Sequence, residues 1–220
     1  DGHIDSFDLA RGVERARIHL LPFVRPTDVR MALPDAAASI ASHDDAVRAA
    51  LACDDLDPDA CNVLVAHQFV TATGCQPETC DSEVVSVGGT DNVDVSAFDS
   101  YDYVALGHLH GAQHVGRPQV RYSGSPLKYS FSEVLHEKSA TIVTIEDGKV
   151  EVGTRPLVPL HDMREMRASF AEFSSGIDEG DPLDYMRITL TDKSLPDAMA
   201  KLRVLYPNIL RLDWEQLSMP

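Results

Sequence analysis

Two short apolar runs, each followed directly by a histidine, restrict the fold of this 220-residue chain more than any other feature. His67 follows the run Asn62-Val-Leu-Val-Ala66, and His108 follows the run Asp102-Tyr-Val-Ala-Leu-Gly107. A continuous apolar run of this length is typical of a strand that is covered on both faces of a parallel sheet. Side chains that bind ligands gather at the carboxyl ends of such strands, so both histidines are expected at one edge of an α/β sheet.

The rest of the chain favours a mixture of strands and helices. Ahead of the runs we expect a hairpin piece with its turn at Asp1-Gly2, a strand over 16–24 and one amphipathic helix over 35–53. After them we expect an antiparallel sheet with strands over 119–123, 138–145 and 149–155, and a two-residue turn at Asp147-Gly148. Beyond Pro156 and Pro159 the order strand, helix, strand, helix, strand predicts a small α+β unit.

The charge balance is strongly acidic, with 35 Asp and Glu against 19 Lys and Arg, a net charge of −16. An acidic surface repels phosphate backbones at long range, which argues against a nucleic-acid binder. Acidity also suits a divalent-metal enzyme, or solubility alone. No apolar run approaches the ~20 residues of a membrane-spanning helix and no signal peptide is visible, so we expect a cytoplasmic protein with no membrane association. The four cysteines form no C-x-x-C pair and are expected to be thiols.

A third histidine, His110, completes a Gly-His-x-His motif after the second run. One histidine at a strand end is more often structural than a ligand, but three together favour a site for a divalent transition metal. The sequence holds no Gly-x-Ser-x-Gly nucleophile elbow and no glycine-rich loop that opens a helix. The segment Ser123-Gly-Ser125 either brings backbone N–H groups and hydroxyls near a phosphate or forms an ordinary turn.

Longer motifs resemble the SbcD family of nuclease subunits within the calcineurin-like metallophosphoesterases. The motifs that carry the resemblance lie at 20–26, 64–69, 86–89, 98–111, 122–133 and 159–165. The resemblance implies an α/β fold, with a metallophosphoesterase β-sandwich flanked by helices. It would place the C-terminal part of the nuclease domain over 1–158 and a small α+β DNA-capping domain over 159–220.

The resemblance also implies a two-metal DNA nuclease subunit, acting as a double-strand exonuclease and a single-strand or hairpin endonuclease in DNA recombination, replication and repair. Two Mn²⁺ ions are expected, with Mg²⁺ as the alternative. His67 and His108 would bind one ion and His110 the other. The expected partners are an SbcC-like ATPase subunit, DNA and a second copy in a homodimer. The residues expected to contact DNA are Tyr122, Ser123, Ser125 and Lys128.

Several family motifs are absent from this sequence. The Asp-x-His, bridging Asp and Gly-Asn-His-Asp motifs supply the other four ligands and the catalytic histidine of the family, so no catalytic residue is assigned here. Asp1-Gly-His3 has the letters of Asp-x-His, but no strand precedes it and we interpret it as a hairpin turn. The C-terminal helices that bind the partner are missing as well. We therefore expect an internal piece that is inactive by itself. The alternatives are a catalytically inactive binding or scaffold fragment and a small-molecule phosphodiesterase of the same superfamily.

Overall fold

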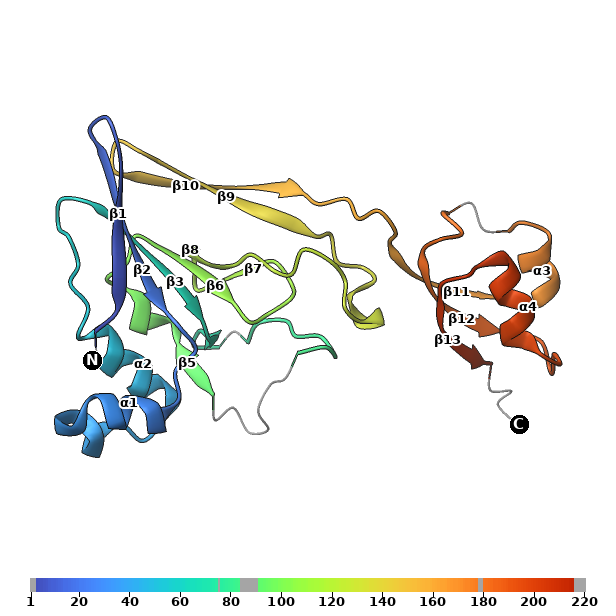
Figure 1. The fold of residues 1–220 in the computed structure, drawn as a ribbon, viewed down its shortest axis with the longest axis horizontal. Helices are drawn as coiled ribbons and strands as arrows, with labels where there is room; N and C mark the ends of the chain where they lie inside the picture. Colours follow the sequence, from blue (N-terminus) through green and yellow to red (C-terminus); the bar gives the residue numbers. More distant parts are fainter. Residues whose placement is uncertain (1–2, 75, 84–90, 178–179, 216–220) are drawn as a thin grey trace. The chain divides into compact units, whose positions relative to one another are not determined.

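The computed structural model describes residues 3–74, 76–83, 91–177 and 180–215. It divides into two compact units, coloured along the sequence in Figure 1. Unit 1 comprises residues 1–126 and 137–157, and unit 2 comprises residues 127–136 and 158–220. The change of unit at 157/158 lies beside the expected boundary at 158/159, whereas residues 127–136 group with the second unit instead of the first.

A six-stranded mixed sheet forms the centre of unit 1 (Figure 1). Its strands, in spatial order, are β1 (Asp5–Arg11), β2 (Glu14–Leu21), β3 (Cys61–His67), β6 (Tyr103–Gly107), β8 (Arg117–Tyr122) and β7 (Gln113–Val115). The four central strands run parallel, and the two edge strands pair antiparallel with their neighbours. Both apolar runs are therefore central parallel strands, as the sequence predicts.

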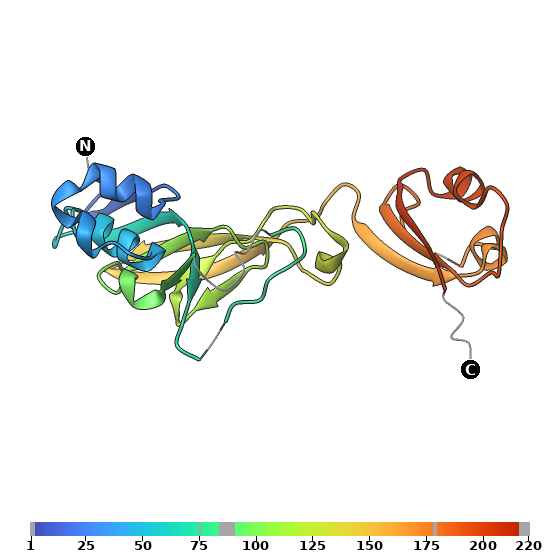
Figure 2. The same ribbon diagram turned by 90° about the horizontal axis from the view of Figure 1, so that it is seen from below.

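Separate layers cover the two faces of the central strands, although Val65 of β3 is 42% exposed and all of β1 is exposed (Figures 1 and 2). One layer holds α1 (Pro26–Ala32), a 3-10 helix (Pro34–Ser39), α2 (His43–Leu51), the strand pair β4 (Phe69–Thr71) and β5 (Asn92–Asp94), and a 3-10 helix (Val95–Phe98). The other layer is the hairpin of β9 (Ser139–Glu146) and β10 (Lys149–Pro156). Burial on both faces is the physical reason for the unbroken apolar runs.

Several sequence-based expectations need correction. The helix expected over 35–53 is divided, because Ser42 begins α2 with a capping box. The Ser42 side chain accepts from the Asp45 backbone N–H, and the Asp45 carboxylate accepts from the Ser42 backbone N–H at 2.9 Å. The hairpin turn of β1 and β2 lies at Gly12, which has a φ of +63°, whereas Asp1-Gly2 lies outside the described residues.

The strand expected over 119–123 is also placed differently from the prediction. It forms β8, which runs parallel to β6 and antiparallel to β7 in the main sheet, whereas β9 and β10 pair antiparallel with each other. Asp147 and Gly148 both have positive φ at the turn of this pair, as the Asp-Gly signal predicts.

Unit 2 is a parallel α/β unit rather than the predicted α+β unit. Its sheet has the order β11 (Met163–Ala168), β12 (Tyr185–Leu190) and β13 (Ile209–Trp214), and both pairs are parallel. The helices α3 (Phe170–Ser174) and α4 (Ala198–Leu205) connect the strands and pack against them in one core. A 3-10 helix (Phe131–Glu133) belongs to the same unit. A helical crossover returns the chain to the same end of the sheet, so each new strand pairs in parallel.

Two further expectations concern the cysteines and the possibility of a membrane-spanning helix. Cys53, Cys61 and Cys80 are free thiols as predicted, whereas Cys75 lies outside the described residues. In the part of the chain that the structure describes, every helix is too short or too polar to cross a membrane.

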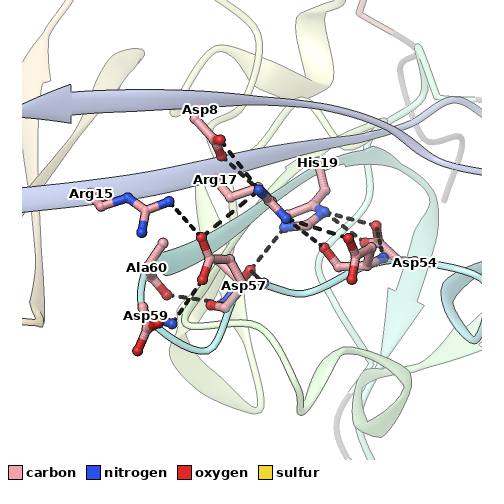
Figure 3. A network of polar contacts seen from close by, with 10 residues as sticks. Asp8, Arg15, Arg17, His19, Asp54, Asp57, Asp59 and Ala60 are labelled. Atoms are coloured by element: carbon pink, nitrogen blue, oxygen red, sulfur yellow. Dashed lines mark hydrogen bonds and ion pairs between the residues drawn. The ribbon is translucent and has the colours of Figure 1, made fainter.

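A buried polar network joins β2 to the loop over 52–60 that leads into β3 (Figure 3). His19 is fully buried, and its Nδ1 and Nε2 lie 2.9 Å from Asp54 Oδ1 and 3.1 Å from Asn62 Oδ1. Tyr101 donates a hydrogen bond to the same Asp54 carboxylate, and burial together with this carboxylate raises the pKa of Tyr101 well above its ordinary value. Ion pairs extend the network toward the surface, namely Arg15–Asp57, Arg17–Asp8 and Arg17–Asp57.

Replacing Tyr101 by phenylalanine should lower the free energy of unfolding by about 1–3 kcal/mol, because the buried Asp54 carboxylate loses a donor. Urea denaturation of the purified chain measures this change. Tyr185→Phe is the matched control, because Tyr185 is exposed. Equal stability of the two variants would contradict a structural role for the Tyr101 hydroxyl.

Candidate metal centre at the strand ends

The register of β3 and β6 brings two histidines together at one edge of the sheet. His67, the last residue of β3, pairs with Gly107, the last residue of β6. His108 follows directly, and its ring centroid lies 5.4 Å from that of His67, with the ring planes nearly perpendicular. Two imidazoles at this separation can bind a single ion, because a metal–nitrogen bond is about 2.1 Å long.

Gly107 allows the His67 ring to lie against the end of β6. A Cβ atom at this position would lie 2.8 Å from Nδ1 of His67, which is closer than real Cβ contacts allow. The missing side chain therefore leaves a space that the His67 ring occupies. The glycine of the Gly-His-x-His motif has a steric role in the site.

Burial and charge favour the neutral, metal-binding form of His108. Burial lowers the pKa of His108, and the nearby His67 lowers it further, whereas the carboxylates of Glu83 and Asp91 act in the opposite direction. A neutral imidazole is the form that binds a metal ion. Aromatic rings line both histidines, with Phe23 centred 6.5 Å from His67 and Phe69 centred 6.0 Å from His108.

The chain after His67 is held by a tyrosine from β8. The Tyr122 hydroxyl accepts from the Val70 N–H at 2.7 Å and donates to the Gln68 carbonyl at 2.8 Å. The Gln68 side chain in turn donates to the carbonyl of Pro22 at 3.2 Å. Tyr122 is fully buried, so the structure does not support the DNA contact expected from its side chain.

The other residues expected to contact DNA have different environments. Ser125 is buried, and its hydroxyl accepts from Lys138 at 2.9 Å. Lys128, in unit 2, donates to Asp162 at 3.0 Å. Ser123 is half-buried, and its backbone N–H reaches the Leu106 carbonyl at 3.4 Å. Ser123 and Lys128 are both half-buried, whereas Tyr122 and Ser125 are buried.

His110, the third expected ligand, follows His108 by two positions. Among the described residues, His67, His108 and His110 do not form a set whose ring nitrogens all lie within 4.8 Å of one another. The three imidazoles therefore do not make one compact set of donors. Ser82 lies 2.9 Å from Nδ1 of His110 and was not singled out from the sequence. The signal that could have found it is the polar loop over 71–91, which is too long for a simple connection.

The donor set fits a divalent transition metal. The imidazoles of His67 and His108 meet at the strand ends, burial favours the neutral form of His108, and the space at Gly107 fits the ring of His67. Unit 2 contains another group of residues whose ligand atoms lie close enough together to hold a metal ion, namely His161, Asp181 and Asp184. Arg164 lies 2.6 Å from the Asp184 carboxylate, and the Leu183 N–H donates to Asp181, so these acids already have partners.

The arginines of unit 2 are largely neutralised by carboxylates. Arginines in such a unit could contact a phosphate backbone or compensate nearby acids. The pairs in the structure are Arg164–Asp184, Arg167–Glu215, Arg187–Glu165, Arg187–Asp213 and Arg211–Asp213, while Arg203 reaches the Ile209 carbonyl. Compensation of acids is therefore the function that these contacts support.

The parallel sheet and the histidines at its strand ends define an α/β protein with a candidate metal centre. The chain is similar to the SbcD component of the nuclease SbcCD from Staphylococcus epidermidis (strain ATCC 12228 / FDA PCI 1200), with 34% identity over 163 residues. The aligned region covers 71% of this chain and 42% of that relative, so the chain spans less than half of the relative's length. No family model matches the chain. The similarity confirms that the chain is SbcD-like over the aligned residues.

Replacing Gly107 by alanine should displace the His67 ring, because the new Cβ would lie 2.8 Å from Nδ1. We expect altered ring resonances of His67 and His108 in ¹H–¹⁵N spectra of the chain, and a lower melting temperature. Gly153→Ala is the matched control, since Gly153 lies on β10 with no atom within 4 Å of its Cβ position. Unchanged histidine resonances in Gly107→Ala would show that the close approach does not determine the ring position.

Proposed function

We propose that this chain carries part of the metal centre of an SbcD-type, metal-dependent DNA nuclease subunit that hydrolyses phosphodiester bonds. The observation that supports this most directly is the meeting of His67 and His108 at adjacent strand ends, with ring centroids 5.4 Å apart. The similarity to a nuclease component supports the same reaction class. Exonuclease action on double strands and endonuclease action on single strands or hairpins are the proposed modes.

His67 and His108 would hold one ion and His110 the other, with Mn²⁺ as the proposed metal. When bound, such a pair of ions supplies an activated water and neutralises charge on the phosphate. The chain's own contribution is to bring the imidazoles of His67 and His108 together, to favour the neutral form of His108 by burial, and to line both rings with Phe23 and Phe69. Ser123 is the residue that we propose for contact with the DNA backbone.

Binding of DNA would depend on more than the charge of this chain. Its net charge is −16, and most of the arginines of unit 2 are paired with acids. We therefore assign the long-range attraction of DNA to bound metal ions and to an SbcC-like ATPase partner. Neither the structure nor the similarity supports the homodimer expected from the family resemblance.

Addition of Mn²⁺ to the metal-free chain should broaden the ring resonances of His67 and His108, because the paramagnetic ion relaxes nuclei close to it. His19 provides an internal control, since it is fully buried in a separate polar network. The broadening should be strongly reduced in His67→Ala. Equal broadening of all three rings would indicate nonspecific binding and contradict the proposed centre.

The chain by itself should bind Mn²⁺ weakly and should not cleave linear or hairpin DNA. Three imidazoles divided between two ions leave each ion with few protein ligands, and Mn²⁺ prefers oxygen to nitrogen donors. A nuclease assay with added Mn²⁺ tests this expectation, with His67→Ala as the control for contaminating nucleases. Cleavage that is lost in His67→Ala would show that the ligands within this chain are sufficient.

A further inference from the structure

A histidine that the proposed metal centre does not use lies in the core of unit 1. His19 of β2 is fully buried, and both of its ring nitrogens have polar neighbours (Figure 3). Nδ1 lies 2.9 Å from the Asp54 carboxylate, and Nε2 lies 3.1 Å from the side-chain oxygen of Asn62. A neutral imidazole donates from one nitrogen and a protonated one donates from both, so the nature of these neighbours decides how many protons the ring carries.

The Asn62 side chain has one orientation that satisfies its own neighbours. Its Nδ2 donates to the carbonyls of Asp57 at 2.8 Å and Ala60 at 3.1 Å, and its Oδ1 accepts from the Asp57 backbone N–H at 3.0 Å. A reversed amide would place an oxygen against two carbonyls and an N–H group against another N–H. The atom that faces His19 is therefore an oxygen, which can only accept, so Nε2 of His19 carries a proton.

The Asp54 carboxylate is an acceptor as well. The Asp55 backbone N–H donates to Oδ1 at 2.9 Å, and the Tyr101 hydroxyl donates to Oδ2. Hydrogen bonds from two donors favour the ionised form of a carboxyl group. The nitrogen that faces an ionised carboxylate must donate, because an oxygen lone pair and a nitrogen lone pair at 2.9 Å repel each other. Nδ1 of His19 therefore carries a proton too, and the partners determine the direction of both hydrogen bonds.

We propose that His19 is a buried cation, and that its Nδ1 proton closes a clamp formed by His19, Asp54 and Asn62. The loop over 52–60 supplies Asp54, β2 supplies His19 and β3 supplies Asn62, so the clamp joins this loop to two strands of the central sheet. A buried charge is tolerated where an opposite charge and hydrogen bonds compensate it, as the Asp54 carboxylate does here. The clamp is a property of the chain without metal and does not depend on the proposed function.

The other charged groups around the clamp have partners of their own. Asp8 of β1 and Asp57 of the loop are both paired with Arg17, and Asp57 is paired with Arg15 as well. Tyr101 is the other titratable group that faces His19, with ring centroids 5.5 Å apart, and its hydroxyl donates to Asp54. In the described part of the chain, Asp54 is therefore the acid that directly holds the proton of His19.

The clamp depends on pH because it needs this proton. If Nδ1 lost it, a nitrogen lone pair would face the carboxylate, and in the described part of the chain Nδ1 has no hydrogen-bonding neighbour other than Asp54. An unfolded histidine releases its proton above pH of about 6.5, whereas the closed clamp keeps it. The folded state then binds more protons than the unfolded state, so stability falls as the pH rises.

Long-range ¹H–¹⁵N spectra of the metal-free chain at pH 7.5 count the protons on the ring directly. Both nitrogens of His19, assigned through its own backbone resonances, should have the chemical shifts of protonated nitrogens. His114 is exposed and serves as the comparison in the same spectrum, because an imidazole in water is mostly neutral at this pH. A wild-type His19 with a single protonated nitrogen would overturn the proposal without requiring any variant.

Replacing Asp54 by asparagine tests whether the carboxylate holds the proton. An amide can donate its own N–H to Nδ1, so His19 should become neutral with its remaining proton on Nε2. Asp55→Asn is the matched control, because Asp55 is the next residue of the loop and its side chain is fully exposed. His19 should keep both protons in this control. A doubly protonated His19 in Asp54→Asn would show that the carboxylate does not hold the proton and would contradict the clamp.

The stability of the chain provides a readout that does not rely on the ring signals. Between pH 7 and pH 8, the equilibrium constant for folding should fall about tenfold more in the wild type than in Asp54→Asn, because one proton more is released on unfolding. Asp55→Asn should follow the wild type, and urea denaturation measures all three proteins. Equal pH dependence of the wild type and Asp54→Asn would overturn the proposal. If Asp54→Asn does not fold, the proton count of the wild-type ring decides the question.

Discussion

Parallel pairing of β3 with β6 determines where the chemistry of unit 1 lies. The register places His67 opposite Gly107, so the next residue of the chain, His108, lies beside the His67 ring. A slip of one residue would turn every side chain of the strand to the opposite face. The register is strongly specified because the layers on both faces bury these strands. The position of the histidines is therefore a consequence of how the core packs.

The site depends on short hydrogen bonds more than on attraction between distant charges. Tyr122 replaces a missing backbone partner after β3, and Lys138 supplies a donor to the carbonyl of His110. Buried hydrogen bonds of this kind are costly to leave unmade, so they constrain the turn that carries His108 and His110 even where each contributes little net stability. The surface ion pairs of unit 2 have the opposite character, since exposed pairs contribute about 0–1 kcal/mol each.

The errors in the sequence-based fold have physical causes. Apolar periodicity predicted one helix over 35–53, but the capping box at Ser42 begins a new helix within that range. In unit 2 the order of elements was predicted well, whereas the direction of strand pairing was not. Pairing direction depends on how each helix returns the chain across the sheet, and periodicity within one strand carries no information about it.

By itself, the sequence determined the central strands, the histidines at their ends and the SbcD-like motifs around them. These features leave a local signal, because a strand covered on both faces must be apolar along its length. The tertiary structure decided that Tyr122 is buried rather than open to DNA, and that Ser82 and Glu83 meet His110. These contacts join residues 27 to 54 positions apart, and hydrogen bonds over such separations leave no period in the sequence. Only folding brings their donors and acceptors within reach.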